Sequence, residues 1–334
     1  MTRHFLPLFI LILSNLSAEA ATITGEESGI ELVQKLAAIR ADTLAKAGPY
    51  TAHISQDSTF SLTRTFVKLK MEFLEQRNGN LQSVTRTSKG TKLTADRGEE
   101  PINEEERLII GESDIAYWHV DNTFAYIWPR RDYDQMPSIA QVLLDGTHAR
   151  DLMKYTYGWG SFNFQSLAES MGQGKHVDAK IQSSFGKVFA LKLTVGDPAS
   201  PDYSADLKID GNQGYLVTSA SMFDGDGVLM EQVLVSGREY EPGIWLPESW
   251  QHDIFRYPEA NGVVERVPAD HSVSRLTSLS LHQELAPITF TPLGLDLPNG
   301  TRVLSGDSNE TMQLTFFESG AFISPDEHVA AASK

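Results

Sequence analysis

The chain has no cysteine among its 334 residues. This absence excludes disulfide bonds, thiol catalysis, and zinc or iron–sulfur sites built on cysteine. It also excludes the lipidated cysteine that anchors a lipoprotein. A chain of this length buries enough apolar surface to fold without covalent cross-links.

Basic residues are scarce. There are 28 Lys and Arg against 44 Asp and Glu, which gives a formal net charge of −16 at pH 7. An acidic chain repels nucleic acids and anionic lipid surfaces unless its basic residues form a patch, and the sequence shows no such patch. We therefore predict no nucleic-acid partner. The densest charged run, residues 96–106, is acidic and predicts a solvated loop between strands, because it lacks the spacing of a calcium loop.

Motifs for catalysis and cofactor binding are missing as well. The nine His residues do not pair at the spacing of common zinc sites. The sequence has neither the Gly-x-Ser-x-Gly turn of serine hydrolases nor a Gly-rich phosphate loop followed by Lys. We therefore predict no catalytic residue, no metal site and no cofactor, and we expect that the protein is not an enzyme.

Strongly apolar runs are confined to the N-terminus. Arg3 and His4 precede an almost wholly apolar stretch from Phe5 to Leu13, and Ala18-Glu19-Ala20 has the small-x-small pattern of a signal peptidase site. The stretch is shorter than the roughly 20 residues that a membrane-spanning helix needs. The sequence predicts a signal peptide over residues 1–20, no transmembrane segment in the mature chain, and a periplasmic or secreted protein.

A helix is predicted near the start of the mature chain. Ser28 to Glu31 has the form of a capping box, and apolar residues recur at helical spacing from Ile30 to Leu44. Gly48-Pro49 ends the pattern. Because one side is apolar and the other is charged, the helix is expected to lie against a surface.

Alternating segments fill most of the remaining chain. They begin with Thr59–Gln76, which reads as one long strand, and hairpin turns such as Asn78-Gly79-Asn80 and Asp224–Gly227 separate those that follow. The short spacing between turns indicates antiparallel pairing. The hairpin within Arg107–Pro129 carries large apolar groups on both faces, so we expect a second layer over it. Residues 137–172 instead follow a helical period and predict a helical insertion.

The stretch YEPGIWLPESW, Tyr240 to Trp250, combines turn-forming and aromatic residues. Gly243 permits a tight turn, and Pro242 and Pro247 fix the approach into a strand. We interpret the stretch as a turn leading into a packed strand rather than as a ligand contact.

The order of these elements resembles that of the periplasmic lipoprotein carriers of the LolA/LolB-like superfamily. Two stretches, YEPGIWLPESWQHDIFR (240–256) and FTPLGLDLPNGTRVLSGD (290–307), resemble segments of uncharacterised exported bacterial members. The expected fold is mainly β (α+β), a curved antiparallel half-barrel sheet whose concave face is covered by the N-terminal helix and the insertion. We expect one domain over residues 22–324, with the insertion at about 137–172, and a flexible tail over 325–334.

The resemblance implies a binding protein that holds a lipid, an acylated protein or another amphiphile in an apolar cavity. Each buried methylene of an acyl chain contributes about 0.8 kcal/mol. The alternatives are an envelope interaction or sensor protein with a filled core, which would have an envelope protein as its partner, and an enzyme acting on extracellular polysaccharide. Aromatic and aliphatic residues of the hairpin and the insertion are the candidate cavity lining, and they would serve equally well as core: Trp118, Tyr126, Trp128, Leu143, Met153, Tyr155 and Trp159.

Overall fold

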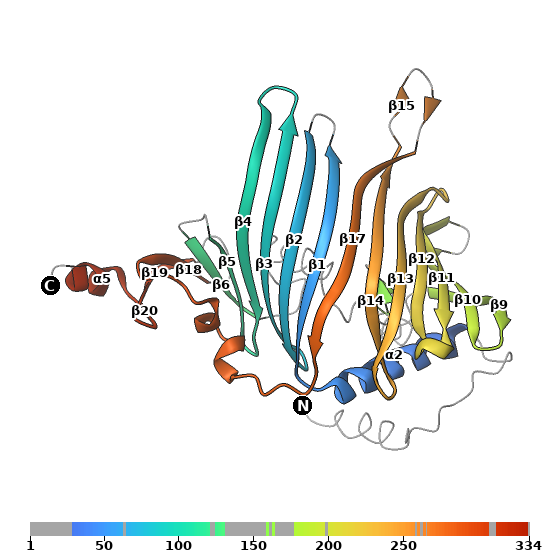
Figure 1. The fold of residues 1–334 in the computed structure, drawn as a ribbon, viewed down its shortest axis with the longest axis horizontal. Helices are drawn as coiled ribbons and strands as arrows, with labels where there is room; N and C mark the ends of the chain where they lie inside the picture. Colours follow the sequence, from blue (N-terminus) through green and yellow to red (C-terminus); the bar gives the residue numbers. More distant parts are fainter. Residues whose placement is uncertain are drawn as a thin grey trace.

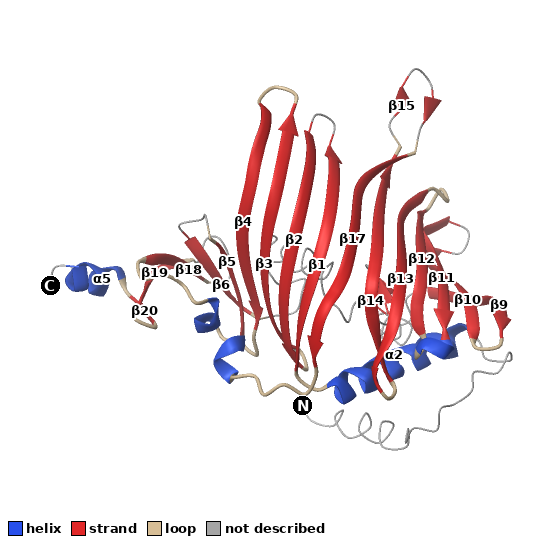
Figure 2. Ribbon diagram, viewed as in Figure 1, coloured by secondary structure: helices blue, strands red, loops and turns tan. Residues whose placement is uncertain are grey.

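A computed structural model describes residues 29–62, 65–120, 124–130, 158–159, 162–163, 177–197, 200–257, 259–260, 263–264, 266–306 and 312–332. Within these ranges the protein is mainly β, as the sequence predicts, with one large sheet and few helices (Figures 1 and 2). The predicted signal peptide and almost all of the predicted insertion lie outside the described residues.

The large sheet has sixteen strands, in the order β20-β19-β18-β6-β5-β4-β3-β2-β1-β17-β14-β13-β12-β11-β10-β9. Every neighbouring pair is antiparallel except β18 and β6, which are parallel. The strands are β1 (Tyr50–Leu62), β2 (Thr65–Asn78), β3 (Leu81–Thr94), β4 (Gly98–Ile110), β5 (Asp114–His119), β6 (Phe124–Pro129), β9 (Val177–Phe185), β10 (Val188–Asp197), β11 (Ser200–Asp210), β12 (Leu216–Asp224), β13 (Leu229–Glu241), β14 (Ile244–Arg256), β17 (Val267–Ser280), β18 (Thr301–Ser305), β19 (Gln313–Glu318) and β20 (Ala321–Ile323).

Shorter elements accompany this sheet. Two small two-stranded sheets pair β7 (Gly158–Trp159) with β8 (Phe162–Asn163), and β15 (Glu259–Ala260) with β16 (Val263–Val264). Single turns of 3-10 helix form η2 (Gly211–Gln213), η3 (Pro287–Phe290) and η4 (Pro292–Leu295). In the part of the chain that the structure describes, no helix is long and apolar enough to cross a membrane.

The predicted N-terminal helix is confirmed as α2 (Gly29–Ala47). It starts at a close contact, because a Cβ on Gly29 would lie 2.0 Å from the carbonyl oxygen of Ala179 in β9. It ends where the backbone N–H of Gly48 donates to the carbonyl oxygen of Leu44. Its apolar side is buried, so the helix packs on the sheet as its periodicity predicts.

Two predictions are wrong, one about where a strand ends and one about a segment expected to be a loop. Thr59–Gln76 was expected as one strand, but β1 ends at Leu62 and β2 begins at Thr65. The two residues between them include no Gly, Pro, Asn or Asp, so the sequence carries no turn signal there. The acidic run at 96–106 was expected as a loop, but Gly98 onward belongs to β4.

Basic residues of β3 explain why the acidic run is a strand. Lys92 lies opposite Glu100 in the β3–β4 register, and Arg86 lies opposite Glu106. The Arg86 guanidinium is 2.5 Å from the Glu106 carboxylate. Opposite charges facing each other across two strands stabilise the pairing, and this complementarity is invisible when each segment is read by itself.

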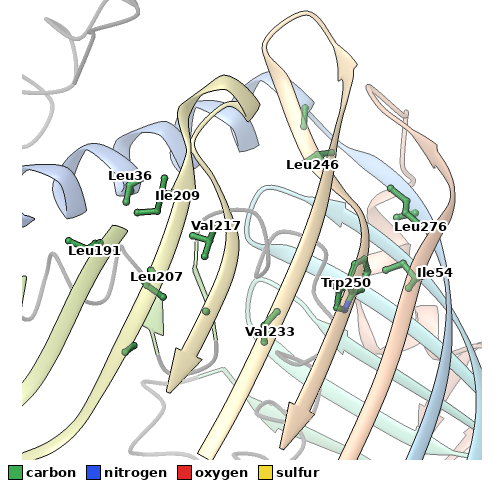
Figure 3. Packing of buried hydrophobic residues seen from close by; sticks show 14 of the residues in the cluster. Leu36, Ile54, Leu191, Leu207, Ile209, Val217, Val233, Leu246, Trp250 and Leu276 are labelled. Carbon is green, nitrogen blue, oxygen red and sulfur yellow. The ribbon is translucent and has the colours of Figure 1, made fainter. Parts of the chain in front are cut away.

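The main hydrophobic core lies on the face of the sheet that carries α2, which we call the α2 face. Figure 3 shows Leu36 of α2 beside Leu191 and Ile209 of the sheet, and all three belong to one cluster of buried residues. The cluster continues across β14, β17 and β1 through Trp250, Leu276 and Ile54, and it reaches β2 and β3. One apolar face therefore runs across strands from both halves of the chain.

A second layer covers the β5–β6 hairpin, as its two apolar faces predict. Trp118, Leu295 and Phe317 belong to one buried cluster that joins β5, η4 and β19. The Arg107 Nη1 of β4 donates to the carbonyl oxygen of Leu295 at 2.7 Å, which fastens η4 to the sheet.

The segment over 325–334, predicted to be a flexible tail, includes helix α5 (Pro325–Ala332). Ser324 caps this helix, with its Oγ accepting from the backbone N–H of Glu327 while the Glu327 carboxylate accepts from the backbone N–H of Ser324. The ring of His328 stacks on Phe316 of β19 at 4.1 Å. Capping and this contact give the segment a helical conformation that its short length does not suggest.

Candidate functional site

The α2 face has a polar strip at its centre. The strand register sets Ser58 of β1 beside Ser272 of β17, and Ser272 beside His252 of β14. Two residues further along β17, Ser274 lies between Gln56 of β1 and Trp250 of β14. In the opposite direction along β17, Asp270 lies between Phe60 of β1 and Ile254 of β14. Glu231 of β13 lies opposite Ile254. We call Glu231, His252, Asp270, Ser272, Ser274, Ser58 and Gln56 the polar stripe.

Apolar side chains flank this stripe on both sides. In the row of Ser58, the neighbour on β2 is Leu69 and the neighbour of His252 on β13 is Val233. In the row of Gln56, the neighbour on β2 is Met71. All three apolar residues are buried members of the main core. The stripe is therefore a polar band across an apolar surface.

Several groups of the stripe are paired. His252 Nε2 lies 2.5 Å from the Glu231 carboxylate, and the Gln56 side chain donates to Ser58 Oγ at 2.7 Å. These contacts join neighbouring strands or neighbouring positions on one strand, so they also hold the register in place.

Two other groups of the stripe lack a partner. Ser274 is 1% exposed, and its Oγ makes no hydrogen bond. One carboxylate oxygen of Asp270 is also buried without a hydrogen bond. An unsatisfied buried polar atom costs about 1–3 kcal/mol, so both atoms are suited to a ligand that offers hydrogen-bonding groups.

Burial and nearby charge raise the pKa of Asp270 to about 6 from its ordinary value of 3.8. Desolvation is the largest cause, and the charges of Asp253 and Glu231 act in the same direction. His252 and His271 oppose them. Perturbed carboxyl groups of this kind cluster at functional sites, although structural networks produce them too.

The opposite face of the same strands carries a separate pair. Asp253 accepts from the Gln251 side chain at 2.7 Å and lies 2.5 Å from His271 Nδ1. Asp253 and His271 face each other in the β14–β17 register, on the side away from the polar stripe. Strand alternation therefore places one acid–histidine pair on each face of the sheet.

Three of the residues predicted to line a cavity have described side chains, and the structure brings two of them together. Tyr126 and Trp128 stack with ring centroids 5.5 Å apart, and both belong to a small cluster with Ile115. Trp118 lies on the other face of the hairpin, under the Arg107 guanidinium at 5.4 Å. Leu143, Met153 and Tyr155 lie outside the described residues, as does the side chain of Trp159.

The stretch from Tyr240 to Trp250 forms a hairpin, as interpreted from the sequence. Pro242 and Gly243 connect β13 to β14, and Gly243 has a φ of 78° that favours glycine. Pro247 lies at a register irregularity opposite Gly237, where a missing N–H is tolerated. Trp250 lies in the main core beside Ser274 of the polar stripe.

Sequence reasoning did not identify the polar stripe. Its one local signal is the segment from Val267 to Ser280, where Asp270, Ser272 and Ser274 alternate with the residues of the other face. A strand that is polar at alternate positions is ordinarily taken to be solvated there. Only the register with β1 and β14 shows that these positions lie on the same face as the main core. Within the described ranges, no group of three or more His, Asp or Glu could hold a metal ion.

No protein-family model matches the chain, and no curated protein matches it. The structure is similar to that of a putative outer membrane lipoprotein-sorting protein domain from Vibrio parahaemolyticus, with 12% identity, a TM-score of 0.41, and coverage of 80% of this chain and 98% of that one.

Two further solved structures are similar. A DUF1329 family protein from Desulfovibrio piger has 13% identity and a TM-score of 0.44, over 80% of this chain and 100% of that one. A LolA superfamily protein from Nitrosomonas europaea has 12% identity and a TM-score of 0.41, over 78% of this chain and 97% of that one. The LolA superfamily, which the sequence resembles, is thus represented among the solved structures to which this chain is similar.

Proposed function

We propose that the protein is an exported binding protein that holds an amphiphile on the α2 face of its sheet. The observation that carries the proposal is the extent of that face. Its partly buried apolar residues continue to Phe60 of β1, Val67 of β2 and Ile102 of β4, whereas the main contacts of α2 are with β9 and β14. An acyl chain lying over these strands would bury the apolar surface that they still expose.

The energy available is sufficient for binding. About ten methylenes placed against the α2 face contribute up to roughly 8 kcal/mol before the cost of association is subtracted. The polar stripe offers hydrogen-bonding groups to the other end of such a ligand. A lipid, an acylated protein or another amphiphile has this combination of a long apolar part and one polar end.

Two further parts of the proposal concern segments outside the described residues. Residues 1–20 act as a signal peptide, which an intact mass beginning after Ala20 would support. The insertion at about 137–172 acts as a lid over the open sheet, which then works as a half-barrel. Leu143, Met153, Tyr155 and Trp159 belong to this lid in the proposal.

The test is native mass spectrometry of the mature protein purified from its own host, followed by extraction of whatever co-purifies. We expect a stoichiometric acyl-bearing species that is lost in Phe60→Glu, because Phe60 packs against the α2-face core. The matched control is Val273→Glu on the opposite face of the neighbouring strand, where Val273 is 44% exposed; it should retain the species.

A contrary result is an unliganded mass together with no uptake of the neutral apolar dye N-phenyl-1-naphthylamine. That outcome would refute the proposal and direct attention to a protein partner in the envelope. A ligand that survives Phe60→Glu would place binding elsewhere on the molecule.

A further inference from the structure

We infer that the polar stripe selects amphiphiles whose polar end is a cationic hydrogen-bond donor, an ammonium group above all, over those that end in a carboxylate or phosphate. The inference rests on the proposed function and adds the chemical class of the ligand. It follows from the charge of the stripe, from its unpartnered acceptors and from their place beside the apolar surface.

The charge of the stripe is the first argument. The groups that act on the Asp270 carboxyl are Glu231, His252, Asp253 and His271. Counting Asp270 itself, three of these five groups are carboxyl groups and the other two are histidines, with no Lys or Arg among them. A second anion brought to this place would meet three carboxyl groups opposed only by the two histidines, whereas an ammonium group would be attracted.

The unpartnered atoms are the second argument. A carboxylate oxygen accepts hydrogen bonds and cannot donate them, so the buried Asp270 oxygen that lacks a bond calls for a donor. Ser274 is 1% exposed. Its Oγ can accept a hydrogen bond from a ligand while its own O–H points away from that ligand. An ammonium group supplies three donors and no acceptor, which fits the carboxylate better than any anionic group does.

The layout of the stripe is the third argument. Asp270, Ser272 and Ser274 alternate along β17 on the α2 face, and they span roughly 13 Å at the rise of a strand. Asp270 lies beside Phe60 of β1, which is only partly buried, whereas Ser274 lies beside the buried Trp250. A ligand can therefore place its ammonium group at Asp270 and extend its chain toward the apolar residues of β2.

The experiment measures the binding of n-decylammonium, n-decanol and n-decanoate to the full mature protein by isothermal titration calorimetry below micellar concentrations. We expect decylammonium to bind about tenfold or more tightly than decanoate, with decanol between them. Asp270→Asn should reduce the ratio to below about threefold while changing the affinity for decanol by less than about twofold.

The matched control is Asp57→Asn. Asp57 is exposed and lies opposite Val273 on the other face of the β1–β17 pair, so this variant removes the same charge from the wrong face. It should leave the ratio unchanged. Glu231→Gln is the second variant within the stripe and should also lower the ratio, which keeps the test decisive if Asp270→Asn fails to fold.

The pH dependence gives an independent readout. On its own face Asp270 has Glu231 of β13 and His252 of β14 nearby, and its neighbour on β1 is the uncharged Phe60. Asp253 of β14 and His271 of β17 act on its carboxyl from the opposite face of the sheet. Because the pKa of Asp270 is about 6 and an alkylammonium stays charged through this range, the affinity for decylammonium should rise between pH 5 and pH 7. The affinity for decanol should not.

The outcomes are distinguishable. If decanol binds and decylammonium has no advantage over decanoate, the inference is wrong and the proposed function stands. The same holds if the ratio in Asp270→Asn and Glu231→Gln equals that of the wild type. If none of the three compounds binds, the proposed function is wrong and the inference falls with it.

Discussion

Glu75 and Asp270 are two acidic side chains on the same face of the same sheet, and their surroundings differ. Glu75 is 1% exposed, and one of its carboxylate oxygens accepts from Tyr50 Oη at 2.9 Å and from Gln82 Nε2 at 3.0 Å. Asp270 has an oxygen without any donor. Glu75 is thus a structural group with its hydrogen bonds made, whereas Asp270 has an oxygen that can still accept a hydrogen bond from a further donor.

Replacing Glu75 shows its structural role. Glu75→Leu would remove the carboxylate oxygen that accepts from Tyr50 and Gln82, and we expect a loss of about 2–4 kcal/mol in the free energy of unfolding. Glu72→Leu is the control, because Glu72 is exposed on the other face of β2, and it should change stability by less than about 0.5 kcal/mol. Urea unfolding curves measure both.

Replacing Asp270 tests its raised pKa. Its folded-state pKa of about 6 exceeds the ordinary value of 3.8, so between these values the folded protein binds the proton more tightly than the unfolded chain. Stability therefore falls as the pH rises through this window, and the loss is complete above about pH 6. Asp270→Asn cannot ionise and should be more stable than the wild type by about 1–2 kcal/mol at pH 7.5, after discounting for solvent screening.

The measurement for Asp270→Asn is thermal unfolding at several pH values. The difference from the wild type should be near zero at pH 4 and should grow up to about pH 6. A difference that is constant over this range would show that Asp270 has an ordinary pKa. Asp57→Asn serves again as the control and should show no such growth.

At the scale of elements, the features that short-range chemistry determines could be predicted. Helix α2 follows from its apolar period, and the β13–β14 hairpin follows from Pro242 and Gly243. The boundary between β1 and β2 and the strand character of β4 could not be predicted. They depend on pairing with residues elsewhere, such as Arg86 opposite Glu106, and no local pattern reports such pairing.

The turn at Gly243 can be tested directly. Its φ of 78° is costly for residues with a side chain, but a Cβ there would meet no atom within 4 Å. Gly243→Ala should therefore cost about 1–2 kcal/mol from backbone strain alone, and Gly243→Asn should cost less because Asn adopts this conformation more readily. Equal losses in the two variants, measured by chemical denaturation, would argue against this explanation.

The packing of α2 can be tested with two residues of the same helix. Leu36 is fully buried in the main core, whereas Ile30 is 41% exposed. Leu36→Ala should lower the free energy of unfolding by about 2–4 kcal/mol, and Ile30→Ala should change it by well under 1 kcal/mol. Similar effects in the two variants would mean that α2 is not held by its apolar side.

At the scale of the whole molecule, one sheet joins parts that are distant in the sequence. The C-terminal strand β18 adds in parallel to β6, and its residue Val303 completes the buried cluster around Trp118. The sequence indicates a mainly β fold. It does not indicate that the last strands pair with β6 and pack against the hairpin of β5 and β6. The polar stripe was missed for the same reason, since it forms only when β1, β17, β14 and β13 lie side by side.

Removing the last strands should therefore expose β6. A chain that ends at Asn299 loses Val303 and Phe317 from the cluster and leaves the edge of β6 unpaired, and unpaired apolar edges promote association. We expect it to form aggregates in size-exclusion chromatography with light scattering. A chain that ends at Ser324 loses only α5 and should elute like the full protein.

The pairing of β1 with β17 has a consequence for the order of folding. Thr51 is the partner of Ser280, so the middle of the sheet cannot be completed until more than two hundred further residues have been synthesised. Each half can form its own hairpins early, but the seam between the halves must wait, and such distant contacts form slowly. The polar stripe lies along this seam. The stripe therefore cannot form while the chain is still being made, and it assembles only once β17 has paired with β1.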